Sequence, residues 1–433
     1  MYFLKKNNKI MVGFLNAAIY NFNNKNVYLV NKKIVSYILE NKFGMIPIEL
    51  IDVMIRETIL TTELAESESE PQVFQYELFD DKYSYEKCKL VYLEITDVCN
   101  FHCIHCYADV KKDATHFMTL QDTSHYVKEI ASLGPCDVRI TGGEPFLNSN
   151  VCEIVDTIVD SVSPISKHSI VSNGSFDIKQ ALYILSKGLE LQISIYGMNE
   201  SKFCEFTRSN AGMYKKVRAN LEYISQTEYK EQILLLFSVN SLTYEEITEF
   251  RAMTEEFGFR YIFNRPASVG RAVENWDKLR LNQNYMEAFS KSQRPAKPFY
   301  CYHLCQLYWT SIMVNGDITP CGFLRTKDHV VGNLKTETFI DVWNSDKYNE
   351  FRKMCAHDVK HCQNCEFKFV CTAGCCGETA SYSGDILNCY SGCQLKPYQN
   401  NQYWKINDNE MYQASKIAAG MFEFVKRGDS LDS

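Results

Sequence analysis

Residues 96–107 read Thr96-Asp97-Val98-Cys99-Asn100-Phe101-His102-Cys103-Ile104-His105-Cys106-Tyr107, and they hold the most informative motif of the chain. The three cysteines have the spacing C-x3-C-x2-C and directly follow the apolar run 90–95. A cubane [4Fe–4S] cluster has four irons, and cysteine thiolates normally hold each of them. Three closely spaced thiolates therefore leave one iron open, and an open iron can bind and reduce a ligand. The spacing alone also permits a zinc site or three unrelated thiols.

A second motif, Thr141-Gly142-Gly143-Glu144-Pro145, ends the next predicted strand, 138–141. Two glycines let the backbone approach a ligand closely, and a carboxylate there could pair with an ammonium group. Taken alone the motif is weak, because turns are rich in glycine and proline. It gains weight from its position, one strand after the three cysteines.

Apolar strand candidates alternate with helical stretches from residue 88 to residue 285. The predicted strands are 138–141, 169–171, 191–195, 233–239 and 261–264, and the predicted helices are 120–133, 151–162, 177–187, 213–225 and 243–257. Repeated strand–helix units predict a parallel sheet, which binds ligands at the carboxyl ends of its strands. Polar residues at such ends are Asn173, Ser194, Asn240 and Arg265.

The two motifs together resemble the radical S-adenosylmethionine (SAM) superfamily. The resemblance implies an α/β fold with a partial (β/α)6 TIM-like barrel, in which Cys99, Cys103 and Cys106 hold a [4Fe–4S] cluster. The open iron would chelate SAM, and reduction would release a 5′-deoxyadenosyl radical. The matching motif would bind the methionyl amino group through Glu144. The other implied SAM contacts are Gly142, Gly143, Pro145, Asn173, Ser194, Asn240 and Arg265. His105 would lie near the adenine, although a core or surface histidine is an equally good interpretation.

Further cysteines lie toward the C-terminus with regular spacing. Cys305 is followed by Gly316 and Cys321, and then by Cys362-x2-Cys365-x5-Cys371-x3-Cys375 and, after 17 residues, Cys393. Cys362, Cys365, Cys371 and Cys375 alone could form a zinc ribbon-like site. That interpretation would leave the other three cysteines without a role.

The whole seven-cysteine pattern resembles a SPASM domain, which carries two auxiliary [4Fe–4S] clusters. Gly270-Arg271-Ala272 matches a turn common in that branch. The resemblance implies that the first auxiliary cluster takes Cys305, Cys321 and Cys375, with Cys301 as a possible fourth ligand. The second would take Cys362, Cys365, Cys371 and Cys393, with Cys389 as a competitor for the last position. If Cys301 is a ligand, the first cluster is closed and only relays electrons.

Composition narrows the class of protein. The chain has 433 residues, 45% of them hydrophobic and 23% charged, which is ordinary for a globular protein with more than one domain. A net charge of −7 argues against a nucleic-acid partner. No apolar run approaches the ~20 residues that span a bilayer. No cleavable signal pattern follows Met1, so we expect no membrane association and a cytoplasmic location. In that reducing compartment, 18 cysteines indicate metal binding rather than disulfides.

Five regions are expected along the chain. Residues 1–60 form a module of hairpin strands and helices, similar to precursor-peptide recognition elements or else a cap on the main domain. Residues 61–87 are an acidic linker, 88–285 the radical SAM core, 286–395 the SPASM domain and 396–433 a tail with a helix at 411–425.

The resemblance implies a peptide maturase that forms a thioether, C–C or C–O crosslink in a ribosomally made precursor peptide. An electron donor such as flavodoxin or ferredoxin would serve it. The related anaerobic sulfatase-maturing enzymes, which make formylglycine, place an Asp base after the cysteine that matches Cys321. Here that residue is Gly322, which disfavours formylglycine formation. A non-catalytic peptide-binding scaffold is a third reading, although all three first cysteines and Glu144 are present. The sequence does not single out a general base.

Overall fold

The computed structural model describes residues 1–12, 17–21, 23, 26–67, 88–280, 309–354, 358–359, 362–363, 365 and 374–388. The predicted linker residues 68–87 and the predicted tail 396–433, with its helix at 411–425, lie outside these ranges. None of the helices in the described part of the chain has the length and apolarity that a membrane crossing requires.

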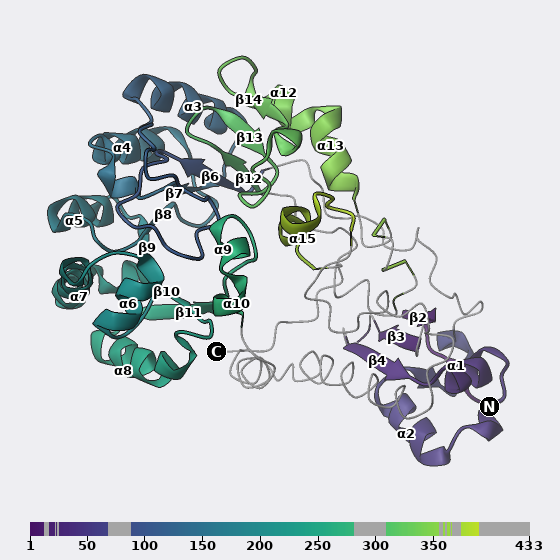
Figure 1. Ribbon diagram of the computed structural model, residues 1–433. Helices are drawn as coiled ribbons and strands as arrows, with labels where there is room; N and C mark the ends of the chain where they lie inside the picture. The colour runs from purple at the N-terminus through teal and green to yellow at the C-terminus, as the bar shows by residue number, and fades with distance from the viewer. Residues whose placement is uncertain are drawn as a thin grey trace.

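The N-terminal unit is a small α+β structure (Figure 1). Its elements are β1 (Phe3–Leu4), β2 (Asn8–Val12), β3 (Ala17–Asn21), β4 (Asn26–Val30), α1 (Lys32–Leu39), α2 (Ile48–Arg56) and β5 (Leu60–Thr61). Strands β2, β3 and β4 form an antiparallel sheet, and β1 pairs with β5. Ile10 and Ile19 of the sheet share a core with Val35, Ile51 and Met54 of the helices. An isolated bridge between Lys5 and Ser67 carries this unit seven residues past the boundary predicted at residue 60.

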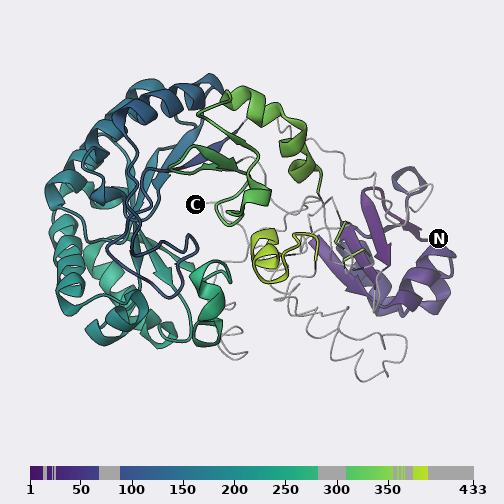
Figure 2. The ribbon, with the colours of Figure 1, turned by 45° about the horizontal axis from the view of Figure 1, so that its top comes forward.

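The barrel region alternates strands and helices as the sequence predicts. Its strands are β6 (Leu90–Glu94), β7 (Asp137–Thr141), β8 (Ser169–Ser172), β9 (Glu190–Ile195), β10 (Ile233–Ser238) and β11 (Arg260–Asn264). Its helices are α3 (Leu120–Ser132), α4 (Val151–Ser161), α5 (Ile178–Ser186), α6 (Glu200–Thr207), α7 (Ala211–Ser225), α8 (Ile247–Phe257), α9 (Arg271–Glu274) and α10 (Trp276–Leu279). The six strands are parallel and pair in sequence order, which confirms the predicted barrel-like sheet. Figure 2 shows the strands curving inside an arc of helices.

The sheet continues into the C-terminal region. Strand β12 (Trp309–Ile312) pairs in parallel with β6, and β13 (Asp317–Thr319) and β14 (Gly332–Asn333) follow as antiparallel strands. Helices α12 (Phe339–Asn344), α13 (Asp346–Lys353) and α15 (Cys376–Ser383) complete the described part of this region. The barrel and the cysteine-rich region therefore share one nine-stranded sheet.

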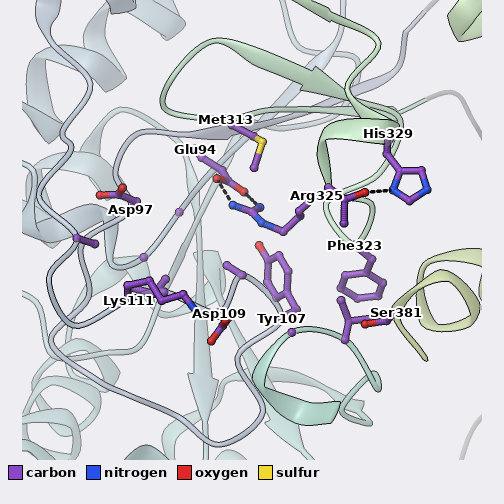
Figure 3. A pocket seen from close by; sticks show the side chains of 18 of the residues that line it. Glu94, Asp97, Tyr107, Asp109, Lys111, Met313, Phe323, Arg325, His329 and Ser381 are labelled. Atoms are coloured by element: carbon purple, nitrogen blue, oxygen red, sulfur yellow. Dashed lines mark hydrogen bonds and ion pairs between the residues drawn. The ribbon is translucent and has the colours of Figure 1, made fainter. Parts of the chain in front are cut away.

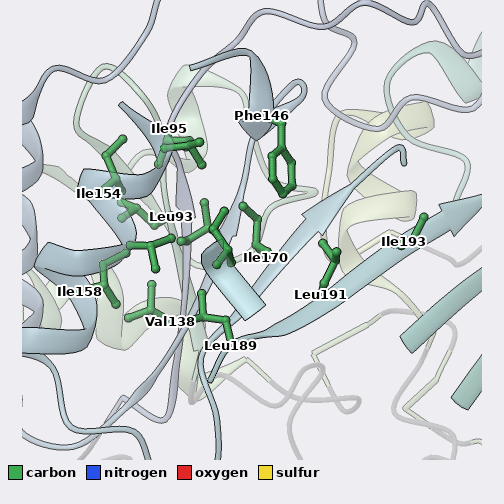
Figure 4. Close-up of a cluster of buried hydrophobic side chains, with 14 of the residues drawn as sticks. Leu93, Ile95, Val138, Phe146, Ile154, Ile158, Ile170, Leu189, Leu191 and Ile193 are labelled. Atoms are coloured by element: carbon green, nitrogen blue, oxygen red, sulfur yellow. The ribbon is translucent and has the colours of Figure 1, made fainter. Parts of the chain in front are cut away.

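The main core lies between the sheet and its helices, where Leu93, Val138 and Ile170 cluster with Ile154 and Ile158 of α4 (Figure 4). Side chains alternate along a strand, so the residues next to these core positions face the barrel interior. Arg139 illustrates this on β7, where it lies 5.2 Å over the ring of Tyr92 on β6. Glu94, two residues after Tyr92, is the last residue of β6 on the same face.

Candidate active site

The three cysteines lie on a loop after β6, residues 95–117, called here the cysteine loop. The backbone N–H groups of His102 and Ile104 donate to the carbonyls of Thr207 and Phe206, at 2.9 and 3.0 Å. Both acceptors belong to the C-terminal end of α6 or lie beside it, where helix carbonyls lack intrahelical partners. The end of α6 therefore fixes the middle of the cysteine loop.

Arg271 holds the same loop from the other side. Its guanidinium is 5% exposed, donates to the Cys103 carbonyl at 2.9 Å and also bonds the Val110 carbonyl. Its backbone N–H donates to the Cys106 carbonyl at 3.0 Å. The preceding Gly270 has φ 58°, and a Cβ there would lie 2.6 Å from the Cys106 carbonyl oxygen. The Gly-Arg-Ala turn that the sequence singled out is thus a support for the cysteine loop.

Burial dominates the acid–base chemistry of two of the three thiols, those of Cys99 and Cys103. It raises the pKa of Cys99 to about 12, with the Glu144 charge adding to the effect. Burial also raises the pKa of Cys103 well above its usual value, and the neighbouring Cys99 and Cys106 sulfurs raise it further. Thiolates crowded in this way need compensating positive charge, which iron supplies when it binds.

The donor set fits a cluster rather than a single ion. Within the described ranges, no three His, Cys, Asp or Glu side chains lie close enough to share one metal. A cubane cluster makes no such demand, because each thiolate binds a different iron. Three soft sulfur ligands from one loop are the set that an iron–sulfur cluster takes.

The two glycines after β7 lie directly against the cysteine loop. A Cβ on Gly142 would be 2.2 Å from the Thr96 carbonyl oxygen, and one on Gly143 would be 2.1 Å from that of Val98. The Gly143 N–H donates to the Thr96 carbonyl at 2.8 Å. Only glycine permits this approach, since real Cβ atoms do not come so close to backbone. Pro145 follows in a buried 3-10 turn, Pro145–Leu147.

Glu144 is almost fully buried, at 1% exposed. Its carboxylate accepts hydrogen bonds from the Asn173 N–H at 2.7 Å, the Ser172 hydroxyl at 2.9 Å and the Phe146 N–H at 3.3 Å. Burial raises the pKa of Glu144 to about 7, although these donors oppose the shift. The carboxylate is therefore fixed in direction before any ligand arrives.

Asn173 joins the glycines and Glu144 beside the cysteines. Its Nδ2 donates to Asn100 Oδ1 at 2.8 Å and lies 4.0 Å from the Cys99 sulfur. Ser194 lies near the end of β9 and hydrogen-bonds to Tyr196, whose partly buried side chain interacts electrostatically with the Cys103 sulfur. The structure thus gathers the predicted residues of β7, β8 and β9 around the cysteine loop.

Asn240 and Arg265 have other partners. The Asn240 side chain is buried in the turn after β10, where it donates to the Ser238 carbonyl and accepts from the Leu242 N–H, each at 2.9 Å. Arg265 reaches Glu378 of α15 through its two terminal nitrogens, at 2.9 and 3.3 Å. Arg265 therefore links the end of β11 to the cysteine-rich region, a contact that the sequence did not reveal.

His105 packs among aromatic rings. Its ring centroid lies 5.0 Å from that of Tyr196 and 4.7 Å from that of Phe206. Its buried Nδ1 has no hydrogen-bond partner among the described residues. Burial, with the charge of Arg271, lowers the pKa of His105 to about 4, so the ring is neutral.

A cavity of about 790 Å³ opens between the cysteine loop, Gly142 and Gly143, and the segment after β13 (Figure 3). Its described lining includes five carboxylates, those of Glu94, Asp97, Asp109, Asp113 and Asp328. Its permanently positive side chains in the described ranges are Lys111 and Arg325. Arg325 is bound to Glu94 through both terminal nitrogens. No local pattern predicts these charged cavity residues, because they come from segments far apart in the chain.

The cysteine-rich region meets the cysteine loop at this cavity. Gly322 follows Cys321, and a Cβ on it would lie 3.7 Å from Cε2 of Tyr107, the residue after Cys106. Of the predicted auxiliary ligands, Cys321, Cys362, Cys365 and Cys375 are described, and Cys375 precedes α15. Cys301, Cys305, Cys371 and Cys393, together with Cys389, lie outside the described residues.

Comparison with known families agrees with this geometry. Residues 93–253 match the radical SAM superfamily, and residues 301–366 match SPASM, an iron–sulfur cluster-binding domain. The chain is a radical SAM enzyme. Its radical SAM domain binds SAM and a [4Fe–4S] cluster, and its SPASM domain binds iron–sulfur clusters.

Proteins with two different activities are similar in sequence to this chain. An AdoMet-dependent heme synthase from Methanosarcina barkeri is 24% identical over 350 residues, which are 71% of this chain and 97% of the relative. A GTP 3′,8-cyclase from Lactiplantibacillus plantarum is 28% identical over 210 residues, 47% of this chain and 60% of the cyclase. The chain thus covers about three fifths of that cyclase.

Solved structures share the fold. SuiB from Streptococcus suis bound to the precursor peptide SuiA superposes with a TM-score of 0.55 at 14% identity, covering 91% of this chain and all of SuiB. AdoMet-bound anSMEcpe superposes with a TM-score of 0.53 at 17% identity, covering 78% of this chain and 98% of anSMEcpe. These likenesses confirm the predicted barrel fold.

Proposed function

We propose that this radical SAM/SPASM enzyme is a peptide maturase that forms an oxidative crosslink, through sulfur, carbon or oxygen, in a ribosomally made precursor peptide. The observation that carries the proposal is the charge of the cavity. Five carboxylates and two permanently positive side chains line it among the described residues, and both positive side chains are already paired, Arg325 with Glu94 and Lys111 with Asp109.

The excess of carboxylates in the cavity favours a peptide over the more negatively charged substrates of the sequence relatives. A nucleoside triphosphate or a porphyrin brings several negative charges, which a carboxylate-rich wall repels unless cations compensate. A peptide brings mainly neutral amides and hydrogen-bonds to both carboxylates and arginine. SuiB, which is bound to a precursor peptide in its solved structure, shares the fold over most of this chain and adds support.

We assign the cofactor contacts as the sequence predicts them, except where the structure gives a side chain another partner. Cys99, Cys103 and Cys106 would hold the [4Fe–4S] cluster, and Gly142, Gly143, Glu144, Pro145, Asn173 and Ser194 would contact SAM. When bound, SAM and the cluster supply a carbon-centred radical that removes a hydrogen atom from the substrate. The residues of this chain position the target carbon and exclude water. Asn240 and Arg265 support the strand ends in this proposal.

Two auxiliary [4Fe–4S] clusters belong to the proposal. The first would take Cys305, Cys321 and Cys375 with Cys301, and the second Cys362, Cys365, Cys371 and Cys393. One of them would accept the electron that remains after the crosslink closes. An external donor such as flavodoxin or ferredoxin would reduce the SAM-binding cluster at Cys99, Cys103 and Cys106, in keeping with a cytoplasmic enzyme.

Residues 1–67 are proposed to recognise the precursor peptide, and the remaining regions follow the division predicted from the sequence.

The formylglycine alternative requires a carboxylate after Cys321, and Gly322 provides none. Glu94, a carboxylate of the same cavity, is held by Arg325 rather than directed at a substrate.

Substrate-dependent SAM cleavage tests the proposal. Reconstituted enzyme, reductant and SAM would be mixed anaerobically with each short peptide encoded beside the gene, with GTP, or with buffer alone. We expect 5′-deoxyadenosine formation to rise with one peptide and to stay at the buffer level with GTP. Stimulation by GTP and by none of the peptides would refute the maturase assignment.

A further inference from the structure

Arg325 occupies an unusual position in the cavity. It follows β13 and Cys321, and its guanidinium points toward the middle of the cavity between Glu94 and Tyr107 (Figure 3). Both of its terminal nitrogens bond Glu94, with one N···O distance of 2.9 Å. The Glu94 side chain is 3% exposed and that of Arg325 is 19% exposed. The pair is therefore fixed, but part of the guanidinium remains open to the cavity.

Aromatic side chains confine the guanidinium further. The Arg325 carbon Cζ lies 5.9 Å from the centroid of the Tyr107 ring. Tyr107 in turn meets Phe323 edge to face, with centroids 5.4 Å apart. A planar guanidinium held by a carboxylate and an aromatic face has little freedom left to lose when it binds a ligand.

The donor count leaves room for a ligand. A guanidinium has five N–H donors and no acceptor, and the hydrogen bonds to Glu94 use two of them. Among the described residues, the Arg325 side chain donates hydrogen bonds to Glu94 alone, and its remaining N–H groups call for an oxygen acceptor. Leaving such donors unmatched when a substrate excludes water is costly.

The charge of the pair selects the kind of acceptor. Glu94 neutralises the guanidinium at close range, so the pair attracts a second anion only weakly. The other described carboxylates of the cavity oppose an anion as well. A neutral carbonyl oxygen meets neither obstacle, and peptides carry one at every residue.

We propose that Arg325, oriented by Glu94 and Tyr107, binds a backbone carbonyl of the peptide substrate next to the residue that is modified. This inference rests on the proposed function. It assigns Arg325 to substrate binding and Glu94 to positioning, with Met313 and Phe323 as the apolar wall for the flanking side chain.

The first test compares peptide KM values for wild type, Arg325→Gln and Arg325→Lys, using the adjacent-gene peptide that wild type modifies. Loss of a charge-assisted hydrogen bond should raise KM about tenfold to hundredfold in Arg325→Gln. The lysine variant should fall between, since an ammonium cannot bond Glu94 at two points and also serve the carbonyl. Arg280→Gln is the matched control, because Arg280 is a 64% exposed side chain paired with Asp277.

A second test identifies the carbonyl and compares each ester with its parent amide in the same enzyme, so that a general loss of activity in the variant cancels. Synthetic precursors with one backbone amide at a time replaced by an ester carry a weaker acceptor at one position. We expect one ester to raise KM for wild type and to have no further effect in Arg325→Gln. Equal ester effects in both enzymes at every position would overturn the inference. If wild type modifies no peptide, the proposed function fails; if it does and KM is unchanged in Arg325→Gln, only the role of Arg325 fails.

Discussion

Gly143 has no room for a side chain, so we expect the site to be especially sensitive to substitution at this position. A Cβ there would lie 2.1 Å from the Val98 carbonyl oxygen and 3.1 Å from the Cys99 nitrogen. Gly143→Ala must therefore displace the cysteine loop. We expect it to lower cluster content and to reduce 5′-deoxyadenosine formation at least about a hundredfold, by the loss that a misplaced reacting group causes. Iron analysis and product chromatography measure both effects.

Gly44→Ala is the control for that substitution. Nothing lies within 4 Å of a Cβ on Gly44, so the alanine should leave iron content and SAM cleavage at the wild-type level. Full activity in Gly143→Ala would mean that the close approach of the two loops is not needed.

His105 makes stability depend on pH. Its folded pKa of about 4 lies below the unfolded value of 6.5, so the unfolded chain binds the proton more readily in between. Protonation of His105 in the unfolded chain therefore lowers the free energy of unfolding as pH falls from 6.5 toward 4. Linkage gives a loss of about 2 kcal/mol between pH 7.5 and pH 5.

The measurement for His105 is urea unfolding of cluster-free protein at those two pH values. His105→Phe keeps the ring packing against Tyr196 and Phe206 but cannot titrate, so it should lose less stability than wild type on acidification. An equal loss in both proteins would show that His105 is protonated without cost in the folded state.

The site residues that could be predicted from the sequence are those that belong to a contiguous motif. The cysteines and the Gly-Gly-Glu motif are contiguous, and their neighbourhood follows from the strand that each one ends. The Glu94–Arg325 pair joins residues 231 positions apart, and no sequence pattern in either segment predicts this ion pair. Arg265 was expected at SAM for its place at a strand end, but that place does not determine which partner a long side chain takes.

Elements were predictable where the apolar pattern is strong. Five predicted strands lie within one residue of β7, β8, β9, β10 and β11, because each is a short apolar run between turn residues. Helix α6 was not predicted, since it buries little more than Phe203 and Phe206. The parallel pairing of β12 with β6 joins two regions that the sequence suggested were separate. Such pairing depends on three-dimensional closure of the sheet rather than on local propensity.

The cysteine loop depends on α9 through Arg271, which makes this short helix a testable support. Arg271→Met removes the hydrogen bonds to the Cys103 and Val110 carbonyls and leaves both acceptors without that donor. We expect a loss of about 3 kcal/mol in the free energy of unfolding, as for a buried charged hydrogen-bonded group. Chemical unfolding of the cluster-free protein measures it.

Arg280→Met is the matched variant on the neighbouring helix end, where the side chain is 64% exposed. It should change stability by less than about 0.5 kcal/mol, as surface substitutions do. Equal effects from the two arginines would mean that Arg271 does not hold the loop.

For the molecule as a whole, the proposal gives the N-terminal unit and the barrel different tasks. Residues 1–67 have a core of their own, with Ile10, Ile19 and Met54 among its members. Deleting residues 1–67 should weaken precursor binding about tenfold or more, while SAM cleavage without peptide continues. Isothermal titration of the precursor into both proteins checks this. Unchanged precursor affinity would reduce the unit to a structural cap.

The radical made in this barrel is proposed to crosslink a peptide. The most direct measurement is anaerobic mass spectrometry of the adjacent-gene peptides after reaction, with 5′-deoxyadenosine quantified in the same samples. We expect one peptide to become lighter by two hydrogens, in proportion to the 5′-deoxyadenosine formed, and no such product from a variant with Cys99, Cys103 and Cys106 all replaced by alanine. Abundant 5′-deoxyadenosine with every peptide unchanged in mass would contradict it.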